Sequence, residues 1–140
     1  MKAKMSAGEF ATLCEEQLPI SKFLDMQVDR FDQDQVDLRA VYSDDMLRPG
    51  GTISGPVMMT LADAAMFGII LANLGPVALA VTTNLSIDFL RKPPPDDVIA
   101  SARLVKLGKR LAVGDIMITS VKTQELVARA SATYSIPSIK

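Results

Sequence analysis

One carboxylate stands alone in the most apolar part of the chain. Between Pro49 and Ile87, Asp63 is the only residue with an acidic or basic side chain. An unpaired, ionised carboxylate costs several kcal/mol to bury, so such a group is either paired within the protein or retained for chemistry. The residue alone leaves both interpretations open: a structural Asp63 held by backbone amides or a cation, and a catalytic Asp63.

The chain contains no histidine among its 140 residues. Catalytic triads and dyads that use histidine, and metal sites that histidine ligates, are therefore excluded. Acid–base chemistry near neutral pH must come from a carboxylate, a lysine, a tyrosine or the single cysteine, Cys14. A nucleophilic Cys14 would need a base beside it, and the sequence offers no evident one. We predict no metal and no cofactor, with Asp63 as the leading catalytic candidate.

Asp63 lies on a helix that the sequence marks clearly. A loop rich in Gly, Pro, Ser and Asp ends at Pro56, a residue favoured in the first helical turn, so Ser54 or Gly55 is the expected N-cap. The run that follows, VMMTLADAAMFGIILAN, is apolar on every face, as in a helix that is buried on nearly all sides. A Gly-Pro pair then ends the helix near residue 73.

The same region is almost apolar enough to span a membrane, over residues 64–81. However, Asn73 and the Gly-Pro pair interrupt this run, and Asp63 borders it. A buried helix followed by a buried strand is the better interpretation, so no membrane partner is expected.

Regular patterns on both sides of this helix predict a mixed fold. Ser6 and Glu9 have the spacing of a capping box at the start of a short helix over residues 6–17. Period-2 alternation favours a strand hairpin before the apolar helix and four strands after it. The expected strands span residues 24–31, 35–42, 77–90, 97–107, 111–121 and 126–136. This order predicts one α+β domain over residues 1–140, with an antiparallel sheet wrapped around one long central helix.

The composition indicates an ordered domain and a cellular compartment, and it argues against one class of partner. Hydrophobic residues make up 49% of the chain and charged residues 22%, which indicates an ordered domain. The net charge of -1 argues against nucleic acid as a principal partner. A lone cysteine cannot form an intrachain disulfide and suits the reducing cytosol. Because the N-terminus also lacks the apolar stretch of a secretory signal, we expect a cytoplasmic protein.

The distance between Asp63 and the start of its helix predicts an oligomer. Unpaired N–H groups and the positive end of the helix dipole at Gly55 suit a developing oxyanion. Asp63 lies eight residues further along the chain, roughly 12 Å away on one helix. Two groups so far apart cannot touch one reacting carbon, so if they cooperate they come from two copies of the chain. A site at a homodimer interface follows.

Three segments carry a resemblance to a known family. They are GGTISGPVMMTLADAAM, TTNLSIDFLRKP and GKRLAVGDI. Their order and spacing resemble the hotdog-fold thioesterases, closest in pattern to the phenylacetic-acid-degradation type of acyl-CoA thioesterase, in which a His-Gly-Gly loop leads into Leu-Ala-Asp-x-Ala on the central helix. The resemblance covers about residues 35–136. It implies a hotdog fold, hydrolysis of an acyl-CoA thioester, and a homodimer or homotetramer.

Carried over by position, the resemblance assigns roles around the expected site. Asp63 matches the catalytic carboxylate, acting as general base on water or as nucleophile. Gly55 matches the glycine whose N–H polarises the thioester carbonyl, and the two are implied to come from opposite subunits. Thr82 matches a Ser/Thr position that helps to hold the attacking water. Ser54 stands where the family has histidine, and its hydroxyl can still donate one hydrogen bond. Arg48 stands where the family has asparagine.

The CoA part of the substrate is expected along basic residues. Arg48 is a further candidate to pair with a carboxylate or phosphate of the substrate. A solvated surface position is the plain alternative for each of these residues. The expected CoA contacts are Arg91, Lys92, Lys106, Lys109 and Arg110.

Two other functions share this fold. A non-catalytic protein that binds acyl-CoA or another acyl ligand is the alternative, because the family's histidine and asparagine are absent here. Hotdog hydratases and dehydratases rely on a histidine, which this chain lacks. Asp63 and Thr82 together favour hydrolysis over binding alone.

Overall fold

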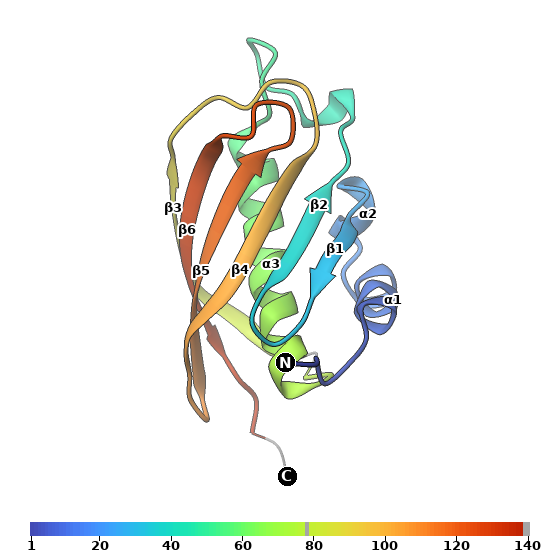
Figure 1. The fold of residues 1–140 in the computed structure, drawn as a ribbon, viewed down its shortest axis with the longest axis vertical. Helices are drawn as coiled ribbons and strands as arrows, with labels where there is room; N and C mark the ends of the chain where they lie inside the picture. Colours follow the sequence, from blue (N-terminus) through green and yellow to red (C-terminus); the bar gives the residue numbers. More distant parts are fainter. Residues whose placement is uncertain (78, 139–140) are drawn as a thin grey trace.

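Six strands form one antiparallel sheet that curls around a single long helix (Figure 1). The computed structural model describes residues 1–77 and 79–138. The strand order is β1-β2-β4-β5-β6-β3, so β1 and β3 are the two edges of the sheet. The architecture confirms the predicted α+β class and the hotdog arrangement. The strands are β1 (Gln27–Phe31), β2 (Val36–Ala40), β3 (Val81–Phe89), β4 (Val98–Leu107), β5 (Leu111–Ser120) and β6 (Leu126–Ser135).

The central helix, α3 (Gly55–Leu74), begins and ends at the residues that the sequence marks. Ser54 is the N-cap, and its hydroxyl accepts a hydrogen bond from the Val57 N–H at 3.4 Å. Gly75 is the C-cap, with a φ of 85° that glycine adopts without strain. The predicted bounds of this helix are therefore correct to within one residue at each end.

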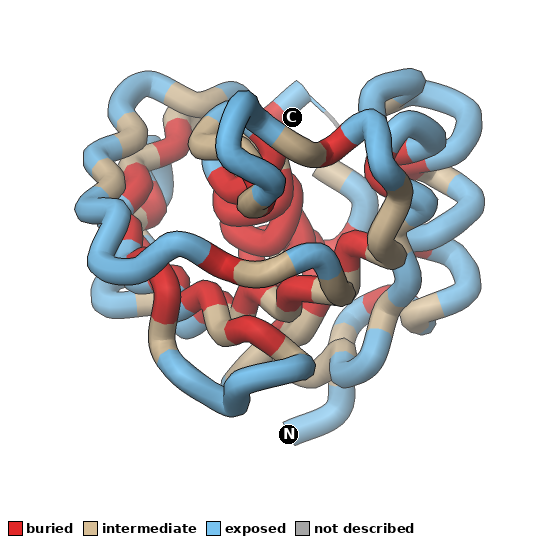
Figure 2. Tube along the Cα trace, turned by 90° about the horizontal axis from the view of Figure 1, so that it is seen from above, coloured by how far each residue is buried: buried red, intermediate tan, exposed pale blue. Residues whose placement is uncertain are grey.

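α3 is apolar on every face because the protein surrounds it. By length and composition it could cross a membrane, yet 72% of its most apolar stretch is buried inside the protein. Seen from above, it is a buried rod ringed by the rest of the chain (Figure 2). The inward side chains of the middle strands, which form the other half of this core, include Val36, Leu38, Ala100, Ile116 and Ile118.

Two short helices precede the sheet and lie beside β1 (Figure 1). The first, α1 (Ala7–Gln17), begins with the predicted capping box. The Ser6 hydroxyl accepts from the Glu9 N–H at 3.0 Å, and the Glu9 carboxylate accepts from the Ser6 N–H at 2.9 Å. This reciprocal pair satisfies two N–H groups at the start of the helix.

The sequence prediction misses the second helix, α2 (Ile20–Phe23), and begins the first strand at residue 24, whereas β1 begins at Gln27. Leu24 and Met26 alternate with polar residues as strand residues do. However, Asp25 has a φ of 45°, which breaks the extended backbone between them. Leu24 and Met26 therefore alternate with polar residues as they would in a strand, although they lie in a turn.

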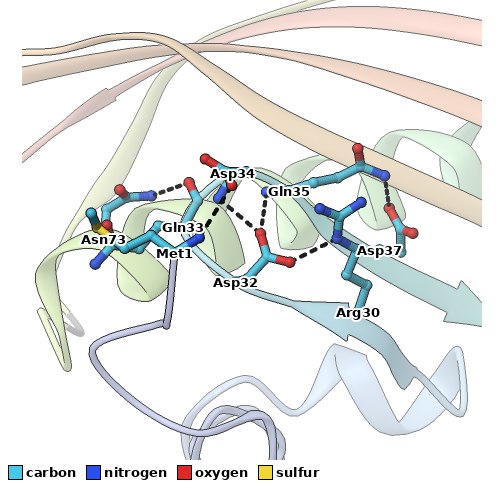
Figure 3. Close-up of polar contacts among 8 residues, drawn as sticks. All are labelled: Met1, Arg30, Asp32, Gln33, Asp34, Gln35, Asp37 and Asn73. Atoms are coloured by element: carbon cyan, nitrogen blue, oxygen red, sulfur yellow. Dashed lines mark hydrogen bonds and ion pairs between the residues drawn. The ribbon is translucent and has the colours of Figure 1, made fainter.

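A polar network ties the β1–β2 turn to the start of the chain and to the end of α3 (Figure 3). The Asp32 carboxylate accepts from the Asp34 N–H at 2.8 Å, which fixes the predicted turn. The side-chain amide of Asn73 donates to the Gln33 carbonyl at 3.0 Å, and the amino group of Met1 donates to Asp34 at 3.2 Å. The C-terminal end of α3 is thereby held against this edge of the sheet.

The three C-terminal strands begin and end within one residue of their predicted bounds. The strand predicted over residues 77–90 is shorter, because the chain turns after Gly75 before β3 begins at Val81. The Ala80 N–H closes this turn by donating to the Val77 carbonyl at 2.9 Å. Residue 78 lies outside the described residues.

β5 and α3 approach each other closely at Gly114, where a side chain would not fit. A Cβ atom at this position would lie 2.5 Å from the Met66 sulfur and 2.9 Å from the Arg103 carbonyl oxygen. Methionine can move aside, but the carbonyl belongs to the neighbouring strand β4. Glycine at this position therefore sets how near the sheet comes to the helix.

Gly114→Ala is expected to lower the free energy of unfolding by about 1–3 kcal/mol, because the Arg103 carbonyl has no room to yield. Gly8→Ala is the matched control. A Cβ at Gly8 in α1 would meet only the Ser6 hydroxyl, at 3.9 Å, so this change should raise the free energy of unfolding by about 0.5 kcal/mol. Urea denaturation followed by circular dichroism measures both. Equal shifts in the two variants would contradict the close approach at Gly114.

Candidate active site

Asp63 is the only acidic or basic residue on α3, and its side chain is half-buried midway along the helix. Its Oδ1 atom accepts two hydrogen bonds, from the Thr82 hydroxyl at 2.7 Å and from the Tyr134 hydroxyl at 2.8 Å. From the part of the chain that the structure describes, Oδ2 accepts none. One carboxylate oxygen is therefore fixed, and the other is the oxygen that can reach a reacting group.

Thr82 and Tyr134 reach Asp63 because they are cross-strand neighbours, paired directly in the β3–β6 ladder. The register shifts between Thr82 and Asn84, which marks a β-bulge. Thr83 and Asn84 are both exposed, whereas Thr82 and Leu85 are both half-buried. Strict alternation would put Thr82 and Leu85 on opposite faces of the sheet. The bulge therefore aims Thr82 at the helix.

Tyr134 is a member of this constellation that the sequence prediction misses. Its ring is buried and stacks on Phe67 of α3, with 6.4 Å between the ring centroids. Burial, reinforced by the charge of Asp63, raises the pKa of the Tyr134 hydroxyl well above its ordinary value, so the hydroxyl keeps its proton and acts as a donor. The sequence feature that could have indicated it is its place after Ala130 and Ala132 on the inward face of the last strand, where it is the one hydroxyl-bearing aromatic residue.

An apolar cavity of about 220 Å³ lies beside the Asp63 carboxylate. Among the residues that line it, Asp63 is the only acid and there is no base. A carboxylate at the wall of an apolar cavity is an arrangement suited to acting on a bound organic molecule. The apolar lining residues include Leu13, Leu18, Met26, Ala64, Phe67 and Ala80.

The N-terminus of α3 carries hydrogen-bond donors in place of a carboxylate. The N–H of Val57 donates to the Ser54 hydroxyl and that of Met58 to the Ser54 carbonyl, while Pro56 has no N–H. Gly55 is then the residue of this first turn whose N–H meets no acceptor among the described residues. The Ser54 hydroxyl accepts a hydrogen bond as the cap, so its own proton is available for donation.

The residues assigned to the site therefore form two groups within one chain. Asp63 and Thr82 are joined by a hydrogen bond. Ser54 and Gly55 lie at the start of α3, roughly 12 Å away along the helix axis. Arg48 is exposed in the loop that leads into α3. A single chain does not bring the two groups together.

The basic residues expected to bind CoA also form two groups, at opposite ends of the sheet (Figure 1). One group follows the end of β3, and the other lies at the turn between β4 and β5, next to the start of β3. All are exposed, and Arg91 donates to the Leu126 carbonyl at 2.7 Å and pairs with Glu125 at 3.3 Å. Within one chain they do not converge on one ligand. The first group is Arg91 and Lys92; the second is Lys106, Lys109 and Arg110.

Cys14 takes no part in the constellation around Asp63. It is buried within α1, and burial raises the pKa of its thiol to about 11. Its backbone carbonyl accepts from the Ser21 hydroxyl at 3.2 Å, which holds the turn after α1. Across residues 1–77 and 79–138, no three histidine, cysteine or acidic side chains gather as a metal site requires.

The chain is similar to one protein family and to several solved structures. The model of the thioesterase superfamily matches residues 50–127. The crystal structure of a provisionally named thioesterase from Silicibacter sp. TM1040 is 42% identical, with a TM-score of 0.88, over 99% of this chain and 96% of the other. The PaaI protein of the E. coli phenylacetic acid degradation operon shares the fold at 23% identity and a TM-score of 0.82, with 94% of each chain covered. A provisionally named esterase of Thermoplasma acidophilum is 24% identical over 81% of this chain and 84% of its own length.

The Cys14 thiol is expected to react slowly with a thiol reagent in the folded protein. A pKa of about 11 in place of 9.0 lowers the thiolate fraction near pH 8 about a hundredfold. Labelling with a chromogenic disulfide should therefore be at least a hundred times slower in the native protein than in denaturant. The native rate should rise about tenfold per pH unit until the thiol ionises. Rapid labelling of the folded protein at neutral pH would show that the Cys14 thiol is reactive enough to be a candidate nucleophile.

Proposed function

Because the chain belongs to the thioesterase superfamily, we propose that it hydrolyses an acyl-CoA thioester to the free acid and CoA, with Asp63 as general base or nucleophile. The observation that carries this proposal is the Asp63 carboxylate, fixed through one oxygen at the wall of an apolar cavity. Water is the second substrate. A reducing cytoplasm is the proposed setting and suits the unpaired Cys14.

The proposed chemistry divides the work between the two oxygens of Asp63. With Oδ1 held by Thr82 and Tyr134, Oδ2 takes a proton from water while the water oxygen bonds to the thioester carbonyl carbon. The tetrahedral oxyanion then collapses, the C–S bond breaks, and the CoA thiolate takes up the proton from Asp63. In the nucleophilic variant, Oδ2 itself bonds to the carbonyl carbon, the C–S bond breaks and CoA leaves as the thiolate. Water then hydrolyses the anhydride to the free acid and the Asp63 carboxylate, and the CoA thiolate takes up the proton that is released.

Thr82 and Tyr134 have different tasks in this scheme. The Thr82 proton is directed to Asp63, so its oxygen lone pairs can accept a hydrogen bond from the attacking water. Tyr134 is buried, and its hydroxyl donates to Oδ1, so in this scheme it acts as a positioning residue that orients the carboxylate. Two donors on one oxygen leave Oδ2 as the oxygen directed to the reaction.

We assign the substrate carbonyl oxygen to the start of α3 in the partner chain. Gly55 offers an N–H at the positive end of the helix, and the Ser54 hydroxyl offers a second donor. A well-placed donor of this kind stabilises an oxyanion by roughly 3–4 kcal/mol. Since Gly55 and Asp63 of one helix are too far apart, the donors that meet Asp63 are the partner's Gly55 and the partner's Ser54.

The edge strand β3 is the surface that we propose joins the two chains. Among the strands of the described residues, none pairs with the outer side of β3, and its ends carry exposed apolar residues, Val81 at 58% and Phe89 at 49% exposure. Antiparallel pairing about the midpoint of the strand brings the Val81 end of one chain beside the Phe89 end of the other. Gly55 packs on the Phe89 ring, where an added Cβ would lie 3.3 Å from the ring. The partner's Gly55 then arrives near Thr82 and hence near the carboxylate.

The same pairing gathers the basic residues. Arg91 and Lys92 of one chain come to the end of the sheet that carries Lys109 and Arg110 of the other. Several positive charges around one ligand suit the phosphates of CoA. The remaining proposed contacts are Arg48, in the loop before the helix start, and Lys106, near the β4–β5 turn. A homotetramer built from two such dimers keeps the same sites.

Asp63→Asn is expected to reduce kcat by at least a hundredfold, because an amide of nearly the same volume can neither accept the proton nor attack. Thr82→Val and Tyr134→Phe should each reduce kcat by less, because Oδ1 keeps one donor in either variant. CoA release from a panel of acyl-CoAs, followed with a thiol-trapping dye, measures all three. Asp115→Asn is the matched control and should not change the rate, because Asp115 is exposed on β5.

Two outcomes would contradict this assignment. An Asp63→Asn variant that keeps more than about a tenth of the wild-type rate, with its circular dichroism unchanged, would remove Asp63 from the reaction. A wild-type protein that binds acyl-CoA but releases CoA from no member of the panel would favour the non-catalytic binding protein.

The shared site predicts complementation between two inactive variants. Asp63→Asn removes the carboxylate, and Gly55→Pro removes the donor N–H at a helix position that accepts proline. In a hybrid dimer, one of the two sites combines the intact Asp63 with the intact Gly55. Mixing the unfolded chains in equal amounts and refolding them should therefore recover about a quarter of the wild-type activity, since half of the dimers are hybrids. No recovery, or a monomer by light scattering that still hydrolyses the substrate, would rule out the shared site.

A further inference from the structure

Over residues 60–67 of α3, the stripe that faces the cavity is the least buried face of the helix. Thr60, Asp63, Ala64 and Phe67 are spaced three or four residues apart, so they lie on one helix face, and all four line the cavity. Three of them are half-buried, whereas the residues on the other faces of this stretch are buried. This face is where a ligand can lie along the helix and still reach the carboxylate.

The corner between α1 and α2 forms one wall of the cavity. Leu18 and Ile20 line the cavity on either side of Pro19, and Ile20 is 48% exposed at its rim. The corner is fixed by hydrogen bonds: the Leu18 N–H donates to the Cys14 carbonyl at 2.8 Å, and the Ser21 N–H donates to the Leu18 carbonyl at 2.9 Å. A wall held in this way has little freedom to move when a ligand enters.

We propose that this cavity holds the acyl group of the substrate and that the α1–α2 corner restricts it to medium-length acyl groups of up to about eight carbons. This inference rests on the proposed function. An apolar cavity of roughly 150 Å³ accommodates one benzene molecule, so a cavity of about 220 Å³ has room for roughly nine carbon-sized atoms. With the carbonyl carbon at Asp63, a fatty acyl chain of twice that length exceeds the volume of the cavity.

The chemistry of the walls agrees with an apolar occupant. Leu13, Met26 and Phe67 offer aliphatic, thioether and aromatic surface, and Asp63 is the only charged residue in the lining. Burial of one CH₂ group in such surroundings should raise kcat/KM about fourfold, as long as the chain still fits. The cavity therefore predicts a rise with acyl length followed by a fall, rather than a steady increase.

The test is a length series. kcat/KM is measured for straight-chain acyl-CoAs from about two to sixteen carbons; it should rise about fourfold per CH₂ up to about eight carbons and fall at least tenfold by sixteen. Leu18→Ala removes side-chain atoms from the α1–α2 wall and enlarges the cavity there. The acyl length with the highest kcat/KM should then increase by at least two carbons. Thr60→Leu narrows the cavity without touching the corner and should move the optimum toward shorter chains. Val105→Ala, which truncates an aliphatic side chain that is 63% exposed on β4, should leave the optimum unchanged.

Binding of S-alkyl-CoA thioethers, which cannot be hydrolysed, separates this inference from the proposed function. If no acyl-CoA is cleaved but thioether affinity by calorimetry peaks near eight carbons and shifts in Leu18→Ala, the acyl cavity is supported and hydrolysis is not. If hydrolysis proceeds with the same kcat/KM at every length, or with an optimum that neither Leu18→Ala nor Thr60→Leu moves, the cavity is not the acyl site although hydrolysis stands.

Discussion

A charged side chain on an apolar helix has to be solvated by the protein, and at Asp63 two hydroxyl groups supply that solvation. A hydrogen bond to a charged group contributes roughly 1.5–3 kcal/mol, so the pair offsets much of the cost of partial burial. Both donors belong to the sheet. The sheet must therefore curl far enough around α3 to bring β6 and β3 onto the same side of the helix, and the order β5-β6-β3 at that edge achieves this.

The approach of sheet to helix depends on small side chains. β6 presents Ala128, Ala130 and Ala132 to the interior before it reaches Tyr134, so the strand lies close enough for the tyrosine hydroxyl to come within 3.0 Å of the Asp63 backbone carbonyl as well as of the carboxylate. A larger residue in place of these alanines would move the strand away from the helix, and the contact to Asp63 would lengthen with it. The geometry of the candidate site therefore depends directly on how closely β6 packs against α3.

Local sequence features were sufficient to predict α3, its caps and the three C-terminal strands, because burial periodicity and helix breakers act over a few residues. They also isolated Asp63, since its surroundings in the sequence contain no other charge. Thr82 could be assigned only through the family resemblance. Tyr134 and the bulge at Thr82 could not be predicted, because each depends on the register between β3 and β6, which are separated by 36 residues of sequence. A bulge is visible only when both partners of a ladder are known.

The absence of histidine shapes the other end of the proposed site. With Pro56 lacking an N–H and Ser54 occupied as the cap, the helix start offers the Gly55 amide and the Ser54 hydroxyl as its donors. Neither group titrates below strongly alkaline pH. The pKa values of the Tyr134 hydroxyl and of the Cys14 thiol are both raised by burial, so these groups also stay protonated through the neutral range. The hydrogen-bond donors of the proposed site therefore keep the same hydrogen-bonding pattern through the neutral range.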